Sequence, residues 1–337
     1  MQVFNNFQLT TYNTFGVTAK AKYFGCFSSV DELDELLEVK EISGRPFILG
    51  GGSNILFTRD YDGLVMKNNI PGITISAEDN DFTYVTAGAG ESWNDLVSFC
   101  VDSNLGGIEN LTLIPGNCGA APMQNIGAYG VELADVFHQL TAFHIKDRSI
   151  RTFNQDACKF AYRESVFKKE HKGEFVILGI TLKLKKDPVF NLSYDALKRV
   201  LNRSNNSELT LKLISDTVAD IRRSKLPDPK FIGNAGSFFK NPQVNSELHA
   251  HLKSLFPDMI SYSFTAGIYK LAAGWLIEQC GYKGKRVGNT GCHKDQALVL
   301  VNYGNASGTE IYAFSEQIID SVFEKFEIVL EREVNVV

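Results

Sequence analysis

The sequence predicts an α+β protein with more than one domain, and three observations support this class. A chain of 337 residues is longer than one compact core usually holds. Helical and extended patterns follow one another without the strict strand–helix alternation of a parallel-sheet protein. The hydrophobic content of 44% and the charged content of 22% are ordinary for a soluble globular chain.

The composition also argues against several classes of protein. No run approaches the roughly 18 apolar residues that would span a bilayer. The first residues lack the basic and then apolar pattern of a secretory signal, so we expect a cytoplasmic protein. Six isolated cysteines without a CxxC pair indicate reduced thiols, and Cys292-His293 has no second cluster that could complete a metal site. The net charge of −5 gives no basic footprint for nucleic acid.

The first elements are short and flank a glycine run. Residues 29–39 predict an amphipathic helix with Ser29 as its N-cap. Residues 47–49 and 55–57 predict strands on either side of GGGSN at 50–54.

This glycine run does not match a dinucleotide fingerprint. A GxGxxG pattern would need glycine where the chain has Ile55, and a helix where it predicts a strand. No GxxxxGK[ST] phosphate loop occurs either. Two interpretations of residues 50–54 stay open: an anion-binding nest of backbone N–H groups, or a plain hairpin turn.

The middle of the chain contains a long tract of small residues. Residues 84–90 predict a strand and turn, and residues 91–103 predict a helix. The tract 114–130 (IPGNCGAAPMQNIGAYG) is too irregular for either, so it predicts a long structured loop. Its density of small residues indicates a backbone that lies flat against a large rigid ligand. Interspersed apolar residues indicate that the loop is packed; these are Ile114, Met123, Ile126 and Tyr129.

The remaining elements are read from the same periodicities. Residues 208–224 predict a helix that ends before a linker at 226–229. Ser307 and Glu310 match a capping box for a helix that continues to about residue 325. Strands are also predicted at 139–153, 174–185, 297–301 and 327–337, and helices at 243–257 and 270–280.

Several polar residues have an ordinary interpretation when each is taken alone. Ser237, in GNAGSFFKNP at 233–242, is either a turn residue or the centre of a reaction. Arg163 is then a surface ion-pair partner, and Tyr162 and Tyr194 are amphipathic boundary residues.

Nine segments follow one another over nearly the whole chain: Asn13-Thr14-Phe15, GGGSN at 50–54, the 114–130 tract, YRES at 162–165, KLPDP at 225–229, GNAGSFFKNP at 233–242, AAGWLIEQCG at 272–281, HKDQALVLVN at 293–302 and LEREV at 330–334. Together, in this order, they resemble the UDP-N-acetylenolpyruvoylglucosamine reductases, flavoenzymes of bacterial cell-wall precursor synthesis. This resemblance changes the interpretation of the single residues.

The resemblance implies a two-part FAD-binding module of the vanillyl-alcohol-oxidase type followed by a C-terminal α+β substrate domain. The implied domains are residues 1–68 with 327–337, residues 69–225, and residues 226–326. FAD is expected to bind non-covalently, NADPH to act as co-substrate in the same pocket, and a sugar nucleotide to be the substrate, with no metal, nucleic acid, membrane or obligate protein partner.

The resemblance also implies roles for individual residues. Ser237 is expected to protonate C2 of the enolpyruvyl group, while Arg163 and Glu333 polarise the substrate carboxylate and stabilise the enolic intermediate. Contacts with substrate are expected from Tyr162, Tyr194, Lys225, Asn241 and Gln296, Tyr194 resembling the subtype with an extra closing loop. The residues expected to hold FAD are Gly50, Gly51, Gly52, Ser53, Asn54, Pro115, Gly116, Gly119, Ala120, Gln124, Asn125, Gly127, Ala128, Tyr129 and Gly130.

Two positions depart from the family pattern. Arg332 stands where the resemblance predicts a proline, which leaves open whether Glu331 or Glu333 is the inward carboxylate. Asn117-Cys118 replaces a more usual small or β-branched pair and places a thiol near the expected flavin. Two other functions stay open: a flavin oxidase that uses oxygen, and a non-catalytic sugar-nucleotide-binding protein.

Overall fold

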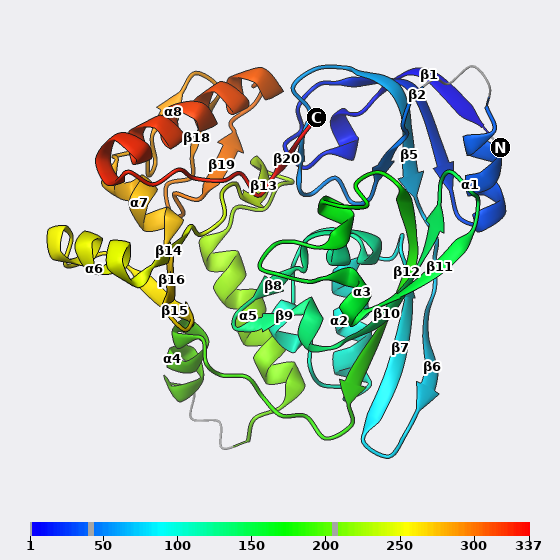
Figure 1. The fold of residues 1–337 in the computed structure, drawn as a ribbon, viewed down its shortest axis with the longest axis horizontal. Coiled ribbons are helices and arrows are strands. Elements are labelled where there is room, and N and C mark those ends of the chain that lie inside the picture. Colours follow the sequence, from blue (N-terminus) through cyan, green and yellow to red (C-terminus); the bar gives the residue numbers. More distant parts are fainter. Residues whose placement is uncertain (1, 40–43, 204–207) are drawn as a thin grey trace. The chain divides into compact units, whose positions relative to one another are not determined.

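The computed structural model describes residues 2–39, 44–203 and 208–337. Its contacts divide the chain into two compact units, each built from separate stretches of sequence (Figure 1). Unit 1 comprises residues 1–7, 21–51 and 62–224, and unit 2 comprises residues 8–20, 52–61 and 225–337. The finer three-part division expected from the sequence stays a prediction.

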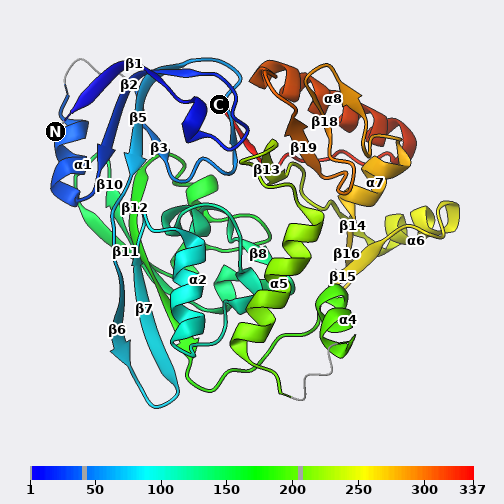
Figure 2. The ribbon, with the colours of Figure 1, turned by 180° about the vertical axis from the view of Figure 1, so that it is seen from behind.

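The larger part of unit 1 is a five-stranded antiparallel sheet that carries helix α2 on one face (Figure 2). Helix α2 spans Trp93–Asp102 and begins at Ser92, whose side chain accepts a hydrogen bond from the Asp95 N–H. In sheet order, the strands are β11 (Ile150–Asn154), β10 (Phe137–His144), β12 (Phe175–Lys185), β7 (Phe82–Gly88) and β6 (Ile73–Glu78).

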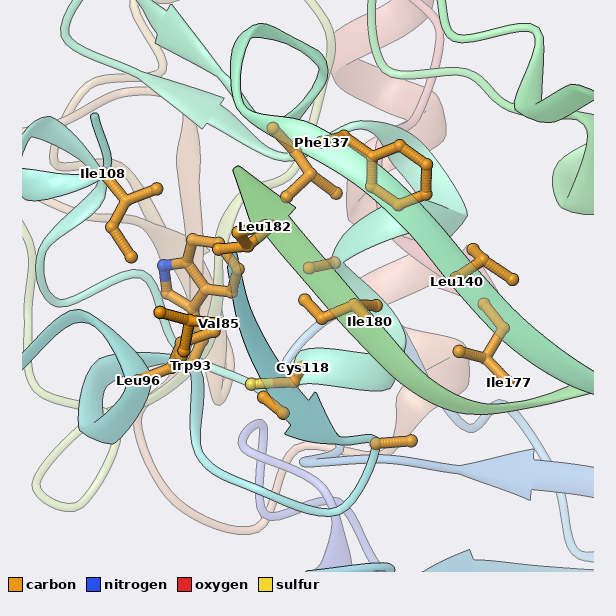
Figure 3. Packing of buried hydrophobic residues seen from close by; sticks show 14 of the residues in the cluster. Val85, Trp93, Leu96, Ile108, Cys118, Phe137, Leu140, Ile177, Ile180 and Leu182 are labelled. Atoms are coloured by element: carbon orange, nitrogen blue, oxygen red, sulfur yellow. The ribbon is translucent and has the colours of Figure 1, made fainter. Parts of the chain in front are cut away.

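The core of this part lies between helix α2 and the sheet. Trp93 and Leu96 of the helix point toward Val85, Ile180 and Leu182 of the strands (Figure 3). All five side chains are at most 1% exposed. The Trp93 indole N–H donates to the Leu111 carbonyl at 3.0 Å, so the largest buried side chain also has its polar atom satisfied.

A second sheet of unit 1 has the order β1 (Val3–Gln8), β2 (Lys20–Phe27), β5 (Tyr61–Asn68), β3 (Phe47–Leu49). Helix α1 (Val30–Leu37) buries Leu33 and Leu36 in the neighbouring core cluster, and the Ser29 side chain accepts a hydrogen bond from the Glu32 N–H. The predicted helix and its N-cap are therefore confirmed.

The rest of unit 1 consists of short elements and two longer helices. Helices α4 (Asp195–Arg203) and α5 (Leu211–Lys225) share a core cluster that includes Leu197, Ile214 and Val218. The short elements are η2 (Glu109–Leu111), η3 (Cys118–Gln124), β8 (Gly127–Ala128), β9 (Val131–Glu132), η4 (Leu133–Asp135), α3 (Gln155–Cys158) and η5 (Val166–Lys168).

Unit 2 combines a four-stranded sheet with helices α7 and α8. The long helix α8 (Gly308–Phe326) contacts β18 and β19, and the predicted capping box of Ser307 and Glu310 is present (Figure 1). Two further β-structures are the sheet β14-β16-β15 and the parallel pair β4 and β20. The bounds are η1 (Thr10–Tyr12), β4 (Ile55–Leu56), β13 (Gly233–Ser237), β14 (Gln243–Asn245), α6 (Ser246–Leu255), β15 (Ser261–Thr265), β16 (Ile268–Leu271), α7 (Ala273–Gln279), β17 (Arg286–Val287), β18 (Thr290–Cys292), β19 (Val299–Asn302) and β20 (Asn335–Val336).

The predicted α+β class is confirmed, and three element predictions in unit 2, at 243–257, 270–280 and 327–337, are wrong in their bounds. The helix predicted at 270–280 begins at Ala273, because residues 268–271 pair with β14 and β15. The strand predicted at 327–337 is reduced to Asn335–Val336. Residues before it make only an isolated bridge, between Arg332 and Phe239.

Across the described stretches of the chain, no helix combines the length and apolar character that a bilayer crossing requires. Within the same stretches, no three His, Cys, Asp or Glu side chains gather as a metal site would need.

Candidate active site

Two glycine-rich loops of unit 1 approach each other so closely that a side chain would not fit at the contact. A Cβ built on Gly51 would lie 2.9 Å from Gly116 Cα and 2.8 Å from Asn117 Oδ1. Gly50 is less crowded, since its Cβ would meet Ala120 Cβ at 3.6 Å. This cradle exposes backbone in place of side chains, and that arrangement suits the phosphates of a nucleotide cofactor.

The hairpin interpretation of GGGSN is wrong, because the flanking strands pair elsewhere. Strand β3 pairs with β5, and strand β4 pairs with β20. In unit 2, Gly52 has φ +65° and its carbonyl accepts the Thr14 N–H at 3.0 Å. A Cβ on Gly52 would lie 2.0 Å from the Tyr12 carbonyl oxygen, so the glycine is required by close packing within unit 2.

The first half of the 114–130 tract follows the segment that leads into helix α2. The Cys118 N–H donates to the Glu91 carbonyl at 2.8 Å, and the Gly119 N–H donates to the Ala89 carbonyl at 3.0 Å. A Cβ on Gly119 would lie only 2.5 Å from Ala89 Cβ. A small residue at position 119 is therefore required by contact with the protein's own backbone. The sequence indicated contact with a ligand as the reason for the small residues of this tract.

The Cys118 thiol is fully buried in this packing. Burial, reinforced by the nearby Glu91 carboxylate, raises the pKa of the thiol far above its ordinary value. A protonated, buried thiol is unreactive, so Cys118 is unsuited to a covalent link with the flavin.

Asn125 organises the turn that follows η3. It has φ +44°, and its buried side chain donates to Glu132 Oε2 at 2.8 Å while its Oδ1 accepts the Ala134 N–H at 2.9 Å. These bonds hold residues 126–128 in place. Asn125 was predicted to bind the cofactor, and its side chain is engaged in folding the loop.

Tyr162 and Arg163 occupy the two central positions of a tight turn. The Ala161 and Glu164 backbones exchange hydrogen bonds of 3.2 and 3.1 Å, and Arg163 has φ +56°. A left-handed backbone is uncommon for a residue with a long side chain, and such residues are often found at functional sites. The guanidinium donates to the Gly127 carbonyl at 2.6 Å and lies 5.2 Å from the Tyr162 ring.

This turn is anchored on the cofactor tract by its neighbours. Ser165 Oγ donates to the Met123 carbonyl at 2.7 Å, and Lys168 Nζ donates to Gln124 Oε1 at 3.4 Å. The structure therefore brings Arg163 together with Gln124 and Gly127. Met123 itself is 37% exposed, so it does not pack inward as its apolar character predicted.

Tyr129 and Tyr194 also meet in unit 1. Their rings lie edge to face at 4.9 Å, and Tyr129 shares a hydrogen bond with Arg222. Burial raises the pKa of Tyr129 and lowers the pKa of Arg222, while the hydrogen bond between them opposes both changes.

Two asparagines attach the Tyr194 segment to the cofactor tract. Asn110 Nδ2 donates to the Tyr129 carbonyl at 2.8 Å and to the Asn191 carbonyl at 2.9 Å. Asn191 Nδ2 donates to the Gly130 carbonyl at 2.9 Å. Neither asparagine was predicted from sequence, since a lone Asn in a loop gives no periodic signal.

In unit 2, Ser237 is presented at the surface by an interrupted strand. Strand β13 pairs with β19, with an irregularity between Asn234 and Ser237, and Gly236 adopts φ +70°. Asn234 Oδ1 accepts the Gly236 N–H at 3.0 Å and so stabilises this kink. Phe238 is fully buried next to the serine, which is itself exposed.

Lys240 is a buried cation with a carboxylate partner on the C-terminal segment. Its side chain is 7% exposed, and its Nζ lies 2.5 Å from Glu331 Oε1, whose side chain is 69% exposed. Glu333 is half-buried and its N–H donates to the Phe238 carbonyl at 2.8 Å. Glu331 is thus engaged with Lys240.

The other predicted site residues of unit 2 lie on loops and helix ends. Asn241 Oδ1 accepts the Ala273 N–H at 3.0 Å at the start of helix α7. Gln296 Oε1 accepts the Leu298 N–H at 3.4 Å, and Lys225 is exposed at the end of α5. Asn54 Nδ2 donates to the Glu333 carbonyl at 3.2 Å.

The remaining predicted cofactor residues of both units are exposed or half-buried: Ser53, Pro115, Ala120, Ala128 and Gly130.

Comparison with known proteins identifies the class from two parts of the chain. Residues 21–151 match the family model described as "FAD binding domain". Residues 228–337 match the model described as "UDP-N-acetylenolpyruvoylglucosamine reductase, C-terminal domain". The cradle at Gly51 and Gly116 fits this cofactor, and together these findings define an FAD-dependent oxidoreductase.

Curated relatives extend the match to the full length. A protein of Flavobacterium johnsoniae named UDP-N-acetylenolpyruvoylglucosamine reductase is 48% identical over 100% of both chains. A protein of the same name from Amoebophilus asiaticus is 45% identical over 100% of both chains. The crystal structure of the Thermus caldophilus reductase covers 99% of this chain and 98% of its own, with a TM-score of 0.67 at 23% identity. The chain belongs to the UDP-N-acetylenolpyruvoylglucosamine reductase family.

Proposed function

We propose that this protein reduces the enolpyruvyl group of UDP-N-acetylglucosamine enolpyruvate to give UDP-N-acetylmuramate, with NADPH as the reductant. The observation that carries the proposal is the full-length identity of 48% to a curated reductase of that name. Bound FAD would supply the redox chemistry by accepting a hydride from NADPH and passing it to C3 of the substrate. A cytoplasmic location and the absence of an obligate protein partner belong to the same proposal.

Ser237 is the proton donor to C2 in this reaction. Its exposed hydroxyl is carried on a strand whose next residues are buried, so the donor is accessible and its backbone is restrained. An alcohol is a weak acid, and the buried ammonium of Lys240 three residues later is the nearest cation in sequence that could stabilise its conjugate base.

Arg163 and Glu333 act on the substrate carboxylate. Charge builds up on that carboxylate as C3 is attacked, and a guanidinium fixed in a tight turn stabilises it without reorganising. Tyr162, Tyr194, Lys225, Asn241 and Gln296 contact the sugar nucleotide in this proposal. The link from Tyr194 to Tyr129 supports a loop of the extra-tyrosine subtype.

The cradle of Gly50, Gly51, Pro115, Gly116, Gly119 and Ala120 would hold the cofactor through backbone contacts. Gly52, Ser53 and Asn54 complete the first loop, and Gln124, Asn125, Gly127, Ala128, Tyr129 and Gly130 complete the second. Of these, Gly52, Gly119 and Asn125 also shape the loops, since they pack against or bond to protein atoms.

The test is an anaerobic assay of the two half-reactions on the purified holoenzyme. NADPH should bleach the flavin absorbance, and the enolpyruvyl substrate should restore it much faster than oxygen does. Ser237→Ala should leave bleaching nearly intact and slow the restoration by about 10²- to 10⁴-fold, the usual contribution of a general acid. Ser98→Ala, an exposed serine on helix α2, is the matched control.

Four outcomes would contradict the proposal. Equal slowing of both half-reactions by Ser237→Ala would remove the proton-donor role. Loss of FAD in Arg163→Ala would make that residue structural. Restoration by oxygen alone would identify an oxidase, and a colourless purified protein would exclude both enzymes.

A further inference from the structure

Three consecutive residues of the C-terminal segment are held by three different interactions. Glu331 pairs with Lys240, whose N–H also donates to the Glu331 carbonyl at 2.9 Å. Arg332 extends to helix α8. The Glu333 N–H donates to the Phe238 carbonyl at 2.8 Å. The segment therefore lies alongside residues 238–240, which directly follow strand β13 and Ser237.

The Arg332 guanidinium contacts three side chains of helix α8 that lie within about one turn. Its Nε donates to Ser315 Oγ at 2.9 Å, and its Nη2 donates to Glu316 Oε1 at 2.5 Å. The guanidinium carbon lies 4.5 Å from the centre of the Tyr312 ring. Ser315 is fully buried and the Arg332 side chain is only 19% exposed, so this is a more enclosed site than an ordinary surface ion pair.

These contacts use geometry that is specific to arginine. A planar guanidinium can donate in two directions while it stacks on a ring, whereas a lysine ammonium cannot do all three at once. Proline, which the family resemblance predicts here, would restrain the chain through its fixed φ. In this chain the restraint comes from a side chain anchored on helix α8.

The register of the segment determines where Glu333 lies. Arg332 bridges Phe239 in antiparallel fashion, so Glu331 is opposite Lys240 and Glu333 is opposite Phe238. Side chains alternate along such a segment, and both glutamates therefore face away from the side of Arg332. A slip of two residues would place Glu333 opposite Lys240 and would remove Glu331 from that pair.

We propose that Arg332 is a positioning residue that sets this register and thereby presents Glu333 for the reaction. The inference rests on the proposed function, because Glu333 is assigned to catalysis there. Arg332 itself touches helix α8 and acts through the backbone of its neighbour.

The test compares Arg332→Gln with Glu316→Gln, which removes the charge at the far end of the clamp. Arg332→Gln should slow substrate-driven flavin reoxidation by about 10- to 100-fold, as expected for a misplacement near 1 Å, while NADPH-driven reduction stays nearly unchanged. Glu316→Gln should give a smaller loss of the same kind. The double variant should be no worse than Arg332→Gln alone, because both changes break one interaction.

Amide hydrogen exchange provides a readout that does not depend on turnover. The amides of Lys240 and Glu333 should exchange faster in Arg332→Gln than in wild-type holoenzyme, since both are bonded across the segment. Lys283→Ala removes an exposed ion pair with Glu278 elsewhere in unit 2 and should change neither amide. Arg332→Lys keeps the charge but not the fork, and it replaces Arg332→Gln if that variant does not fold.

Three results would overturn the positioning role: an equal fall in the rates of both half-reactions, no fall in either rate, and unchanged amide exchange together with slow reoxidation. The last result would mean that Arg332 acts on the substrate directly. A wild-type enzyme whose flavin is not reoxidised by the enolpyruvyl substrate would refute the proposed function instead, and amide exchange would still decide whether the clamp exists.

Discussion

Gly51→Ala tests whether glycine is required at position 51 because the neighbouring loop leaves no room for a side chain. The added methyl group would lie 2.8 Å from Asn117 Oδ1 and 2.9 Å from Gly116 Cα. Neither neighbour is easily displaced. The Asn117 amide donates to the Gly90 carbonyl, and the Gly116 carbonyl accepts the Trp93 N–H at 3.0 Å.

Overpacking of this kind costs about 1–3 kcal/mol. For a unit of this size, that corresponds to a fall of about 2–10 °C in the melting temperature. If the loops move apart to accommodate the methyl group, FAD affinity should also fall, by about 5- to 150-fold for the same free energy. The assays are thermal unfolding of apoprotein and holoenzyme, and fluorescence titration of apoprotein with FAD.

Gly50→Ala is the matched control. Its Cβ would make ordinary contacts, 3.6 Å from Ala120 Cβ and 3.8 Å from Asn117 Cβ, and Gly50 does not have a left-handed φ. Apoprotein with this change should be as stable as wild type, or more stable by up to about 1 kcal/mol, because alanine restricts the unfolded chain. A Gly51→Ala apoprotein that melts like wild type, or an equal loss in Gly50→Ala, would refute the reasoning.

Three further predictions address other parts of the molecule. His293 is 8% exposed, and burial lowers the pKa of its imidazole below 6.5, so the unfolded chain binds the proton more readily and the free energy of unfolding should fall as pH drops below that value. His293→Gln should flatten this fall in thermal melts between about pH 7 and pH 5. An unchanged dependence of stability on pH in that variant would contradict the prediction. Asn191→Ala removes the hydrogen bond to the Gly130 carbonyl and should raise KM for the sugar nucleotide several-fold, with little change in the rate of flavin reduction. Equal effects on KM and kcat would argue that Asn191 does not act by positioning the Tyr194 segment. A maleimide should label the half-buried Cys26 well before the fully buried Cys118, as peptide mass spectrometry would show, and the reverse order would mean that the 114–130 tract opens.

The sequence predicted elements well where the local signal and the packing agree. The helix beginning after Ser307 has a capping box, and the structure reproduces both halves of it. The helix predicted at 243–257 shows the limit, because residues 243–245 pair with 268–270 and helix α6 begins after Asn245 as its cap. Pairing with a strand more than 20 residues away leaves no trace in local periodicity.

The same limit applies to the candidate site. The family resemblance pointed to Ser237 and Arg163, but the surroundings of these residues depend on partners far away in the chain. Lys240 finds Glu331 across 91 positions, and Arg163 finds the Gly127 carbonyl across 36. In the terminal segment Leu330 is buried and Glu331 is exposed, although most of that segment lacks a strand partner.

The discontinuous make-up of unit 2 has a consequence for the order in which the chain folds. Asn302 Nδ2 donates to the Phe15 carbonyl across 287 positions, and Asn54 reaches the Glu333 carbonyl across 279. Closing a loop of that length costs about 5 kcal/mol in chain entropy. During synthesis, nearly all of unit 1 has left the ribosome before the third stretch of unit 2 is made, so residues 8–20 and 52–61 must wait without their native partners. Phe15 and Phe57, each 1% exposed in the folded protein, are then among the apolar side chains that a chaperone would meet.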